Sequence, residues 1–191
     1  GLAVAADLAA KLKRRRPCRR ARVVFFNALF ERGRGYNDLE SREEKLRILR
    51  GALDAMERRF SPNVILIACN TLSVLLPALD HKKNGCVRGI VRLGVDLLEQ
   101  ALRGNAEAKA IIFATRTTIE EGHHADLLER RGITRGRLVT QVCPSLAWSI
   151  SRGPASDETR EKIAAYIQAA ASRLEGYRGP IFASLNCTHY G

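Results

Sequence analysis

Two cysteines stand in similar polar clusters, one in each half of the chain. Cys69 lies in the run 68–71 (ACNT), and Cys187 lies in the run 186–190 (NCTHY). Each cysteine follows an apolar run, and hydroxyl, amide and backbone N–H groups that can bind a carboxylate surround it. A thiol with a reference pKa of about 8.5 can give or take a proton near neutral pH if its surroundings tune it. The pair therefore predicts acid–base chemistry on a small molecule that carries a carboxylate.

Each of these cysteines also has a less specific interpretation. A single cysteine after a strand is more often a small buried apolar residue than a catalyst. Two such cysteines, each beside a threonine and a second polar residue, favour a site. His189, two residues after Cys187, is expected to support that thiol as an acid or an orienting group. The alternative for His189 is a ring satisfied by local hydrogen bonds.

The elements that must position these residues alternate along the chain. Continuous apolar runs predict strands, and apolar residues at three- and four-residue spacing predict helices. Strands are expected at 22–26, 63–68, 87–91, 110–114, 137–142 and 181–185. Helices are expected at 2–12, 41–60, around 95–102, 118–131 and 156–174.

This alternation predicts an α/β fold built from parallel sheets with right-handed crossovers. We expect two similar parallel-sheet lobes with flanking helices, 1–92 with its first strand missing and 93–191. Parallel sheets bind ligands at the carboxyl ends of their strands, so the active site is expected in the cleft between the lobes.

Two of the expected helices carry further local signals. Ser41 and Glu44 form an S-x-x-E capping box at the start of helix 41–60. Its expected core face carries Leu46, Leu49, Leu53, Met56 and Phe60. The expected inward face of helix 156–174 carries Ile163, Tyr166, Ile167, Ala170 and Leu174.

Composition limits the class of protein. The chain has 191 residues, of which 46% are hydrophobic, so a packed core is expected. No apolar run approaches the roughly 20 residues of a membrane-spanning helix, and the basic cluster 11–20 follows the apolar start, unlike a secretory signal. A cytoplasmic protein is therefore expected. The net charge of +12 is dispersed outside 11–20, and that cluster has no aromatic residue, so nucleic-acid binding is not favoured.

The cysteine and histidine spacing argues against disulfide and metal frameworks. The five cysteines include no C-x-x-C pair, and no Cys/His pair has zinc-site spacing. His123 and His124 are adjacent, so they are poorly placed as joint ligands and are expected on a helix surface. Cys18, Cys86 and Cys143 are expected to be core or surface thiols.

The motifs ACNT and CTHY resemble the two signature motifs of glutamate racemase and the wider aspartate/glutamate racemase family. Segments 25–41, 89–96, 114–119 and 142–153 are similar to further family segments in the same order. The resemblance implies racemisation of an acidic amino acid, glutamate preferred, with one thiol on each face of Cα. It implies no metal, pyridoxal phosphate or nucleotide, a possible homodimer, and a role in supplying D-glutamate for peptidoglycan.

The same resemblance assigns expected roles to individual residues. Cys69 and Cys187 would be the acid–base pair, supported by His189. Asn70, Thr71 and Thr188 would bind the ammonium and carboxylate groups, and Thr115 and Thr118 would form the family's Thr-rich contact. Tyr36 and Asn37 stand where the family offers backbone N–H groups to the side-chain carboxylate.

The chain also departs from the family pattern. The Asp-Ser pair that ends the family's first strand and the segment beyond its second cysteine motif are absent from these residues. Ser151 stands where the family has an acidic residue, Asn37 replaces a glycine, and Asn186 replaces a small residue. A divergent member is expected. Trp148 is expected to pack near the edge of the cleft.

Two other functions stay open at this point. The chain could be a related isomerase or racemase, of the maleate or hydantoin type, although two retained cysteines argue against a one-cysteine decarboxylase. It could also be a catalytically weak or inactive binding member, for which salt-dependent DNA binding and insensitivity to cysteine substitution would be signs.

Overall fold

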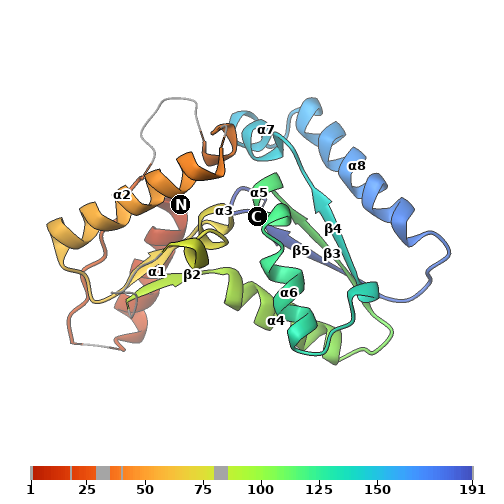
Figure 1. Cartoon of the computed structure of the whole chain (residues 1–191), viewed down its shortest axis with the longest axis horizontal. Helices are drawn as coiled ribbons and strands as arrows, with labels where there is room; N and C mark the ends of the chain where they lie inside the picture. The colour runs from red at the N-terminus through yellow and green to blue at the C-terminus, as the bar shows by residue number, and fades with distance from the viewer. Residues whose placement is uncertain (1, 18, 29–34, 40, 80–85, 191) are drawn as a thin grey trace.

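The computed structural model describes residues 2–17, 19–28, 35–39, 41–79 and 86–190. In this part of the chain the strands form two parallel sheets (Figure 1). The first sheet pairs β1 (Ile65–Ile67) with β2 (Val87–Gly89). The second sheet has the order β4 (Leu138–Val142), β3 (Lys109–Ala114), β5 (Ile181–Asn186). The predicted α/β class with two parallel sheets is confirmed.

Helices flank both sheets and connect their strands. They are α1 (Leu2–Arg15), α2 (Arg42–Phe60), α3 (Asn70–Ser73), α4 (Val91–Arg103), α5 (Arg116–Glu120), α6 (His123–Arg130), α7 (Leu146–Arg152) and α8 (Asp157–Ala171). Short 3₁₀ turns add η1 (Tyr36–Asp38), η2 (Leu76–Ala78), η3 (Arg135–Arg137) and η4 (Ser172–Leu174). In Figure 1, α1 and α2 lie on the side of the first sheet, and α7 and α8 lie on the side of the second.

The expected helix 118–131 is instead two helices, α5 and α6. Gly122 lies between them with a φ of +67°, in the left-handed region where a helix cannot continue and glycine is favoured. Helix α4 begins four residues before the expected helix 95–102, so the expected lobe boundary at 92/93 falls within its first turn.

The predicted strand at 22–26 is wrong. Residues 21–27 form no helix or strand, and the side chains of Val23, Val24 and Phe25 are 39 to 46% exposed. A strand needs backbone hydrogen bonds to a neighbour, and no described strand pairs with this segment. An apolar run alone was therefore not enough to predict a strand here.

Helix α2 follows its local sequence signals closely. The Ser41 hydroxyl accepts a hydrogen bond from the Glu44 backbone N–H at 3.0 Å, which confirms the N-cap half of the predicted capping box. Leu49 and Leu53 are buried on the expected face. The helix ends at Ser61, whose left-handed φ of 41° stops the hydrogen-bond ladder.

The expected inward face of α8 is only partly correct. Ala170 is fully buried, but Ile163 and Ile167 are 37% and 53% exposed. Thr159 is also fully buried and lies on the face of Ala170, three turns away. Ile167 lies about 60° round the helix from Ala170 and is more than half exposed. The short side chains of Thr159 and Ala170 are thus the buried ones on this helix, and the larger Ile163 and Ile167 are exposed.

The core has two parts, which meet at β3. One cluster joins the two sheets and includes Leu53 of α2, Val95 of α4 and Ile112 of β3. The other lies on the opposite face of the second sheet and includes Ile111 and Phe113. Alternate side chains of β3 thus enter different clusters, as expected for a central strand that reads as a continuous apolar run.

His124 corrects one surface prediction. It lies in α6 and is buried, with no hydrogen-bond partner for either ring nitrogen among the described residues. Burial, with a smaller effect of His123, lowers the pKa of His124 to about 4, so the ring is neutral at physiological pH. Among the described helices, none is long and apolar enough to cross a membrane.

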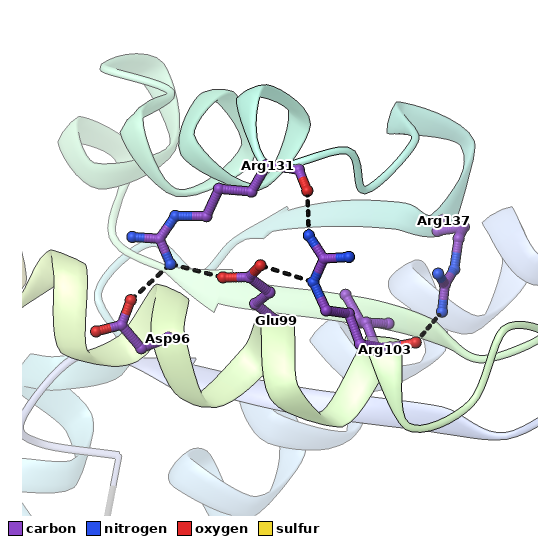
Figure 2. A network of polar contacts seen from close by, with 6 residues as sticks. Asp96, Glu99, Arg103, Arg131 and Arg137 are labelled. Carbon is purple, nitrogen blue, oxygen red and sulfur yellow. Dashed lines mark hydrogen bonds and ion pairs between the residues drawn. The ribbon is translucent and has the colours of Figure 1, made fainter.

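A polar network ties α4 to the end of α6 (Figure 2). Arg131 Nη1 contacts Asp96 Oδ1 at 2.5 Å and Glu99 Oε2 at 2.7 Å, and Arg103 contacts Glu99 from the other side. These guanidinium hydrogen bonds lower the pKa of Glu99, with Arg103 the larger cause. The guanidinium of Arg137 donates to the carbonyl oxygens of residues 102, 105 and 108 at 2.7 to 2.8 Å. It thereby caps the C-terminal end of α4.

Arg137→Met is expected to destabilise the chain by about 2 kcal/mol, because three carbonyl groups lose a charged donor. Urea denaturation followed by circular dichroism measures the change. The control is Arg135→Met, which removes an exposed ion pair with Asp126 and should cost less than about 1 kcal/mol. Equal losses in the two variants would show that the carbonyl contacts contribute nothing beyond surface charge.

Candidate active site

A cavity of about 760 Å³ opens where strands of both sheets end. Cys69 follows β1, Thr115 follows β3, Pro144 follows β4, and Cys187 follows β5, and all four line this cavity. Side chains from the two sheets thus share one space at the carboxyl ends of parallel strands, where ligands bind in such folds. Both thiols singled out in the sequence face the same cavity.

Most of the sequence-predicted site residues are brought together here. Those that line the cavity are Tyr36, Asn37, Cys69, Asn70, Thr71, Thr115, Cys187, Thr188 and His189. Thr118 does not line it: its side chain is 1% exposed, and its hydroxyl lies 3.0 Å from the hydroxyl of Thr115. Thr118 therefore supports Thr115 from behind, which corrects its expected contact with the substrate. Part of the expected substrate loop (29–34 and 40) and Cys18 fall outside the described residues.

Threonine hydroxyls join the two halves of the site. Thr71 Oγ1 lies 2.9 Å from Thr115 Oγ1, so a residue after β1 is hydrogen-bonded to a residue after β3. Thr71 Oγ1 also lies 3.5 Å from Asn37 Oδ1, a weak contact to the turn η1. Thr71 and Thr115 are both buried. A buried hydroxyl pair of this kind fixes the relative position of the elements that carry it.

Cys69 is held by the turn that connects β1 to α3. It is the residue before the first turn of α3, with extended backbone angles. Burial raises the pKa of the Cys69 thiol, while the backbone N–H groups of Leu72 and Thr71 and the Thr71 hydroxyl oppose that shift. Near neutral pH the free site therefore holds Cys69 as a thiol.

Ser73 and Gly89 fix this turn against the second strand of its sheet. The Ser73 hydroxyl donates to the carbonyl oxygen of Ile67 at 3.1 Å and accepts from the N–H of Ile90 at 3.1 Å. A Cβ atom at residue 89 would lie only 2.8 Å from Ser73 Cβ, so glycine is required for this close approach. The position of α3, and hence of Cys69, depends on that contact.

Cys187 lies opposite in the fold, directly after β5. Burial raises its pKa to about 11, with smaller effects from the His189 backbone N–H, which lowers it, and from Cys69, which raises it. The Sγ of Cys187 lies 3.5 Å from Nδ1 of His189. Burial lowers the pKa of His189, so its ring is neutral near pH 7 and can hydrogen-bond to the thiol.

Tyr36 forms part of the cavity wall beside Cys69. Its hydroxyl is buried without a hydrogen-bond partner among the described residues. Burial, and then the nearby Cys69, raises the pKa of Tyr36, so the phenol keeps its proton. The phenol is a donor that a bound ligand can satisfy.

The charged residues that line the cavity were not predicted from the sequence. Arg42 and Glu121 form a two-contact ion pair at 2.5 and 3.2 Å, and Lys45 is buried. Lys45 stands four residues before Leu49, on the predicted core face of α2, and this lysine in an apolar stripe was a usable signal. The Arg42–Glu121 ion pair had no such signal in the sequence, because its two residues are 79 positions apart.

The far wall of the cavity is formed by α7. Trp148 is 43% exposed there, close to the predicted edge position, and the Arg152 guanidinium lies 5.8 Å from its ring centre. Ser151 also lines the cavity, and its hydroxyl donates to the carbonyl oxygen of Ala147 at 2.9 Å. Ser151 therefore offers no carboxylate to the site. No group of three or more His, Cys, Asp or Glu residues within the described ranges is arranged to hold a metal ion.

The chain matches the protein family described as Asp/Glu/Hydantoin racemase over residues 2–179. Similar folds occur among solved structures. The glutamate racemase of Campylobacter jejuni subsp. jejuni has a TM-score of 0.65 at 23% identity, covering 82% of this chain and 58% of its own. That of Francisella tularensis subsp. tularensis, in complex with D-glutamate, has a TM-score of 0.61 at 21% identity, covering 82% and 55%.

An aspartate racemase from Picrophilus torridus is also similar, with a TM-score of 0.50 at 15% identity, covering 78% of this chain and 67% of its own. At these identities the likeness shows the fold. The chain spans little more than half the length of the two glutamate racemases that it resembles. The comparison with curated proteins finds no match.

Alkylation of Cys187 is expected to be slow at pH 7 and to accelerate as the pH rises towards its pKa of about 11, because only the thiolate reacts. Iodoacetamide labelling across the pH range, followed by peptide mass spectrometry, gives the profile. Cys86, which does not line the cavity, is followed in the same samples as a reference. A Cys187 midpoint below pH 8.5 would contradict the buried environment described above.

Gly89→Ala is expected to destabilise the chain by about 1 to 3 kcal/mol, since the new methyl group would overlap Ser73. Gly51→Ala is the matched control. Gly51 lies within α2 with no atom within 4 Å of an added Cβ, so alanine there should stabilise by about 0.5 to 1 kcal/mol. Urea denaturation of the two variants measures both effects, and a neutral Gly89→Ala would mean that α3 is not held by this contact.

Proposed function

Because the chain belongs to the Asp/Glu/Hydantoin racemase family, we propose that it racemises an acidic amino acid, with glutamate preferred, by proton transfer between Cys69 and Cys187. The observation that carries the proposal is the shared cavity, which both thiols line from different sheets. Residues 1–92 and 93–191 would then act as two lobes, each supplying one cysteine. D-Glutamate made in this way would serve peptidoglycan synthesis in the cytoplasm.

The proposed reaction exchanges one proton on Cα for another on the opposite face. The thiolate of one cysteine removes the Cα proton, so an S–H bond forms as the C–H bond breaks and the electron pair passes into the α-carboxylate. The thiol of the other cysteine then gives its proton to the opposite face of Cα. The product is the mirror-image amino acid, and the two cysteines have exchanged protonation states.

The main barrier to this step is the low acidity of the Cα proton. Hydrogen-bond donors aimed at the α-carboxylate stabilise the carbanion as it forms. The side chains of Asn70, Thr71 and Thr188 line the cavity next to the two cysteines in sequence and supply such groups. We assign the α-carboxylate and the ammonium group to these residues.

His189 has a distinct role in this scheme. The raised pKa of Cys187 keeps it a thiol near pH 7, and a neutral imidazole 3.5 Å from the sulfur can hydrogen-bond to it. We therefore assign His189 to orient Cys187 and to support it as an acid.

Comparisons support the substrate class more than the particular acid. One structural neighbour is a glutamate racemase in complex with D-glutamate, and another is an aspartate racemase. The family description also includes hydantoin racemases. The preference for glutamate is thus part of the proposal, to be compared with aspartate and a 5-substituted hydantoin.

Single substitutions of the two cysteines give the sharpest test. Cys69→Ser and Cys187→Ser should each lower racemisation by at least about 100-fold, because general acid–base catalysis contributes about 10²- to 10⁴-fold. The remaining thiol still faces the Cα proton of one enantiomer. Each variant is therefore expected to exchange that proton with solvent deuterium in one enantiomer only, and the two variants should prefer opposite enantiomers.

Proton NMR in deuterated buffer follows this exchange for L- and D-glutamate, L- and D-aspartate and the hydantoin. Cys86→Ser, outside the cavity, is the control and should keep wild-type rates. Absence of exchange by the wild-type chain with all of these substrates would remove the proposal. Exchange of the same enantiomer by both cysteine variants would rule out catalysis from opposite faces.

A further inference from the structure

Lys45 is a buried cation that faces the cavity from the first turn of α2. The residue is 8% exposed, and it is among the residues that line the cavity. Its Nζ donates to the hydroxyl of Thr117, on α5, at 3.0 Å. This buried ammonium group therefore contacts a neutral oxygen.

The carboxylates that line the same cavity are engaged elsewhere. Glu121 is paired with Arg42, Glu120 lies 3.6 Å from Arg116, and Asp38 accepts the backbone N–H of Gly35 at 2.7 Å. Within the described ranges, no carboxylate oxygen lies within 4.0 Å of the Lys45 ammonium group. Its charge is left without an anionic partner in the part of the chain that the structure shows.

This arrangement is unfavourable for an empty site. A buried charge without a counter-charge costs free energy, and the first turn of a helix carries a partial positive charge that adds repulsion. A methionine at this position of α2 would fill the same space without that cost. An anion bound in the cavity would compensate the lysine.

We propose that Lys45 binds the distal carboxylate of a dicarboxylic substrate and so selects acidic over neutral amino acids. This inference rests on the proposed racemase function. The α-carboxylate and ammonium group are attached to the carbon that must lie between the two sulfurs, so their partners are the residues adjacent to Cys69 and Cys187. Lys45 reaches the cavity from α2 instead, which suits a second carboxylate separated from Cα by methylene groups.

The kinetic test compares Lys45→Met with Arg47→Met. Both variants remove one positive charge from α2, but Arg47 is exposed and does not line the cavity. Lys45→Met should lower kcat/KM for the dicarboxylic substrate by about 30-fold, the loss of one charge-assisted hydrogen bond, mostly through KM. It should change kcat/KM for the uncharged amide glutamine by less than about threefold. Arg47→Met should leave both unchanged.

Either of two kinetic results would overturn the inference. One is an equal loss with glutamate and glutamine, which would indicate a general disturbance of the site. The other is no loss with any substrate. Thermal unfolding adds an independent reading: Lys45→Met should melt at the wild-type temperature or above, because an uncompensated charge is removed, whereas a structural role for Lys45 predicts a lower melting temperature.

A binding measurement separates this inference from the racemase proposal. Glutarate has two carboxylates and no amino group, so its binding, measured by calorimetry, needs no catalysis. It should bind the wild type and Arg47→Met and lose about 30-fold in affinity for Lys45→Met. That result supports Lys45 as a carboxylate site even if no racemisation is seen. Glutarate binding that is insensitive to Lys45, or a Lys45 dependence seen with inorganic phosphate alone, would overturn it.

Discussion

The whole site depends on bringing the carboxyl ends of two separate parallel sheets to a single cavity. The two sheets share no strand, so backbone hydrogen bonds cannot set their relative position. Two features do so instead: the hydrophobic cluster that joins them, and the buried hydroxyl contact between Thr71 and Thr115. Because each sheet carries one of the two cysteines, this contact also sets the space between the thiols.

The buried environment of the cavity keeps the two cysteines and His189 uncharged near neutral pH. Burial raises the pKa of Cys69 and Cys187 and lowers that of His189, so all three are neutral near pH 7. In the proposed reaction, the thiolate that removes the Cα proton must therefore form within the complex. A neutral resting site also avoids two thiolates facing each other, which the mutual influence of the two cysteines would disfavour.

The sequence predicted best what depends on short-range pattern. The strands β1, β3, β4 and β5 were expected because buried parallel strands appear as continuous apolar runs, and the residues that follow a strand could be placed at the site. The segment 22–26 has the same pattern but no pairing partner among the described strands, and pairing is a long-range property. The Arg42–Glu121 ion pair and the exposed Ile163 and Ile167 were missed for the same reason: each depends on which element lies opposite, which the local sequence does not contain. Lys45 differs from these cases, because its position within the apolar stripe of α2 could be seen in the sequence.

The two cysteines have unlike supports, and this has a consequence for the chemistry. Cys69 is surrounded by backbone N–H groups and the Thr71 hydroxyl, which stabilise a thiolate by hydrogen bonding. Cys187 has the ring of His189 3.5 Å from its sulfur, and Ser151 offers no carboxylate nearby. In the proposed reaction, fixed dipoles would stabilise the thiolate of Cys69 once it forms in the complex, whereas the neighbouring imidazole would orient Cys187. Because the equilibrium between mirror-image amino acids is unity, these supports can change how kcat and KM are divided in each direction but not the ratio of the two kcat/KM values. In such a site, asymmetry of the protein appears as unequal kcat for the two enantiomers, matched by an equal inequality in KM.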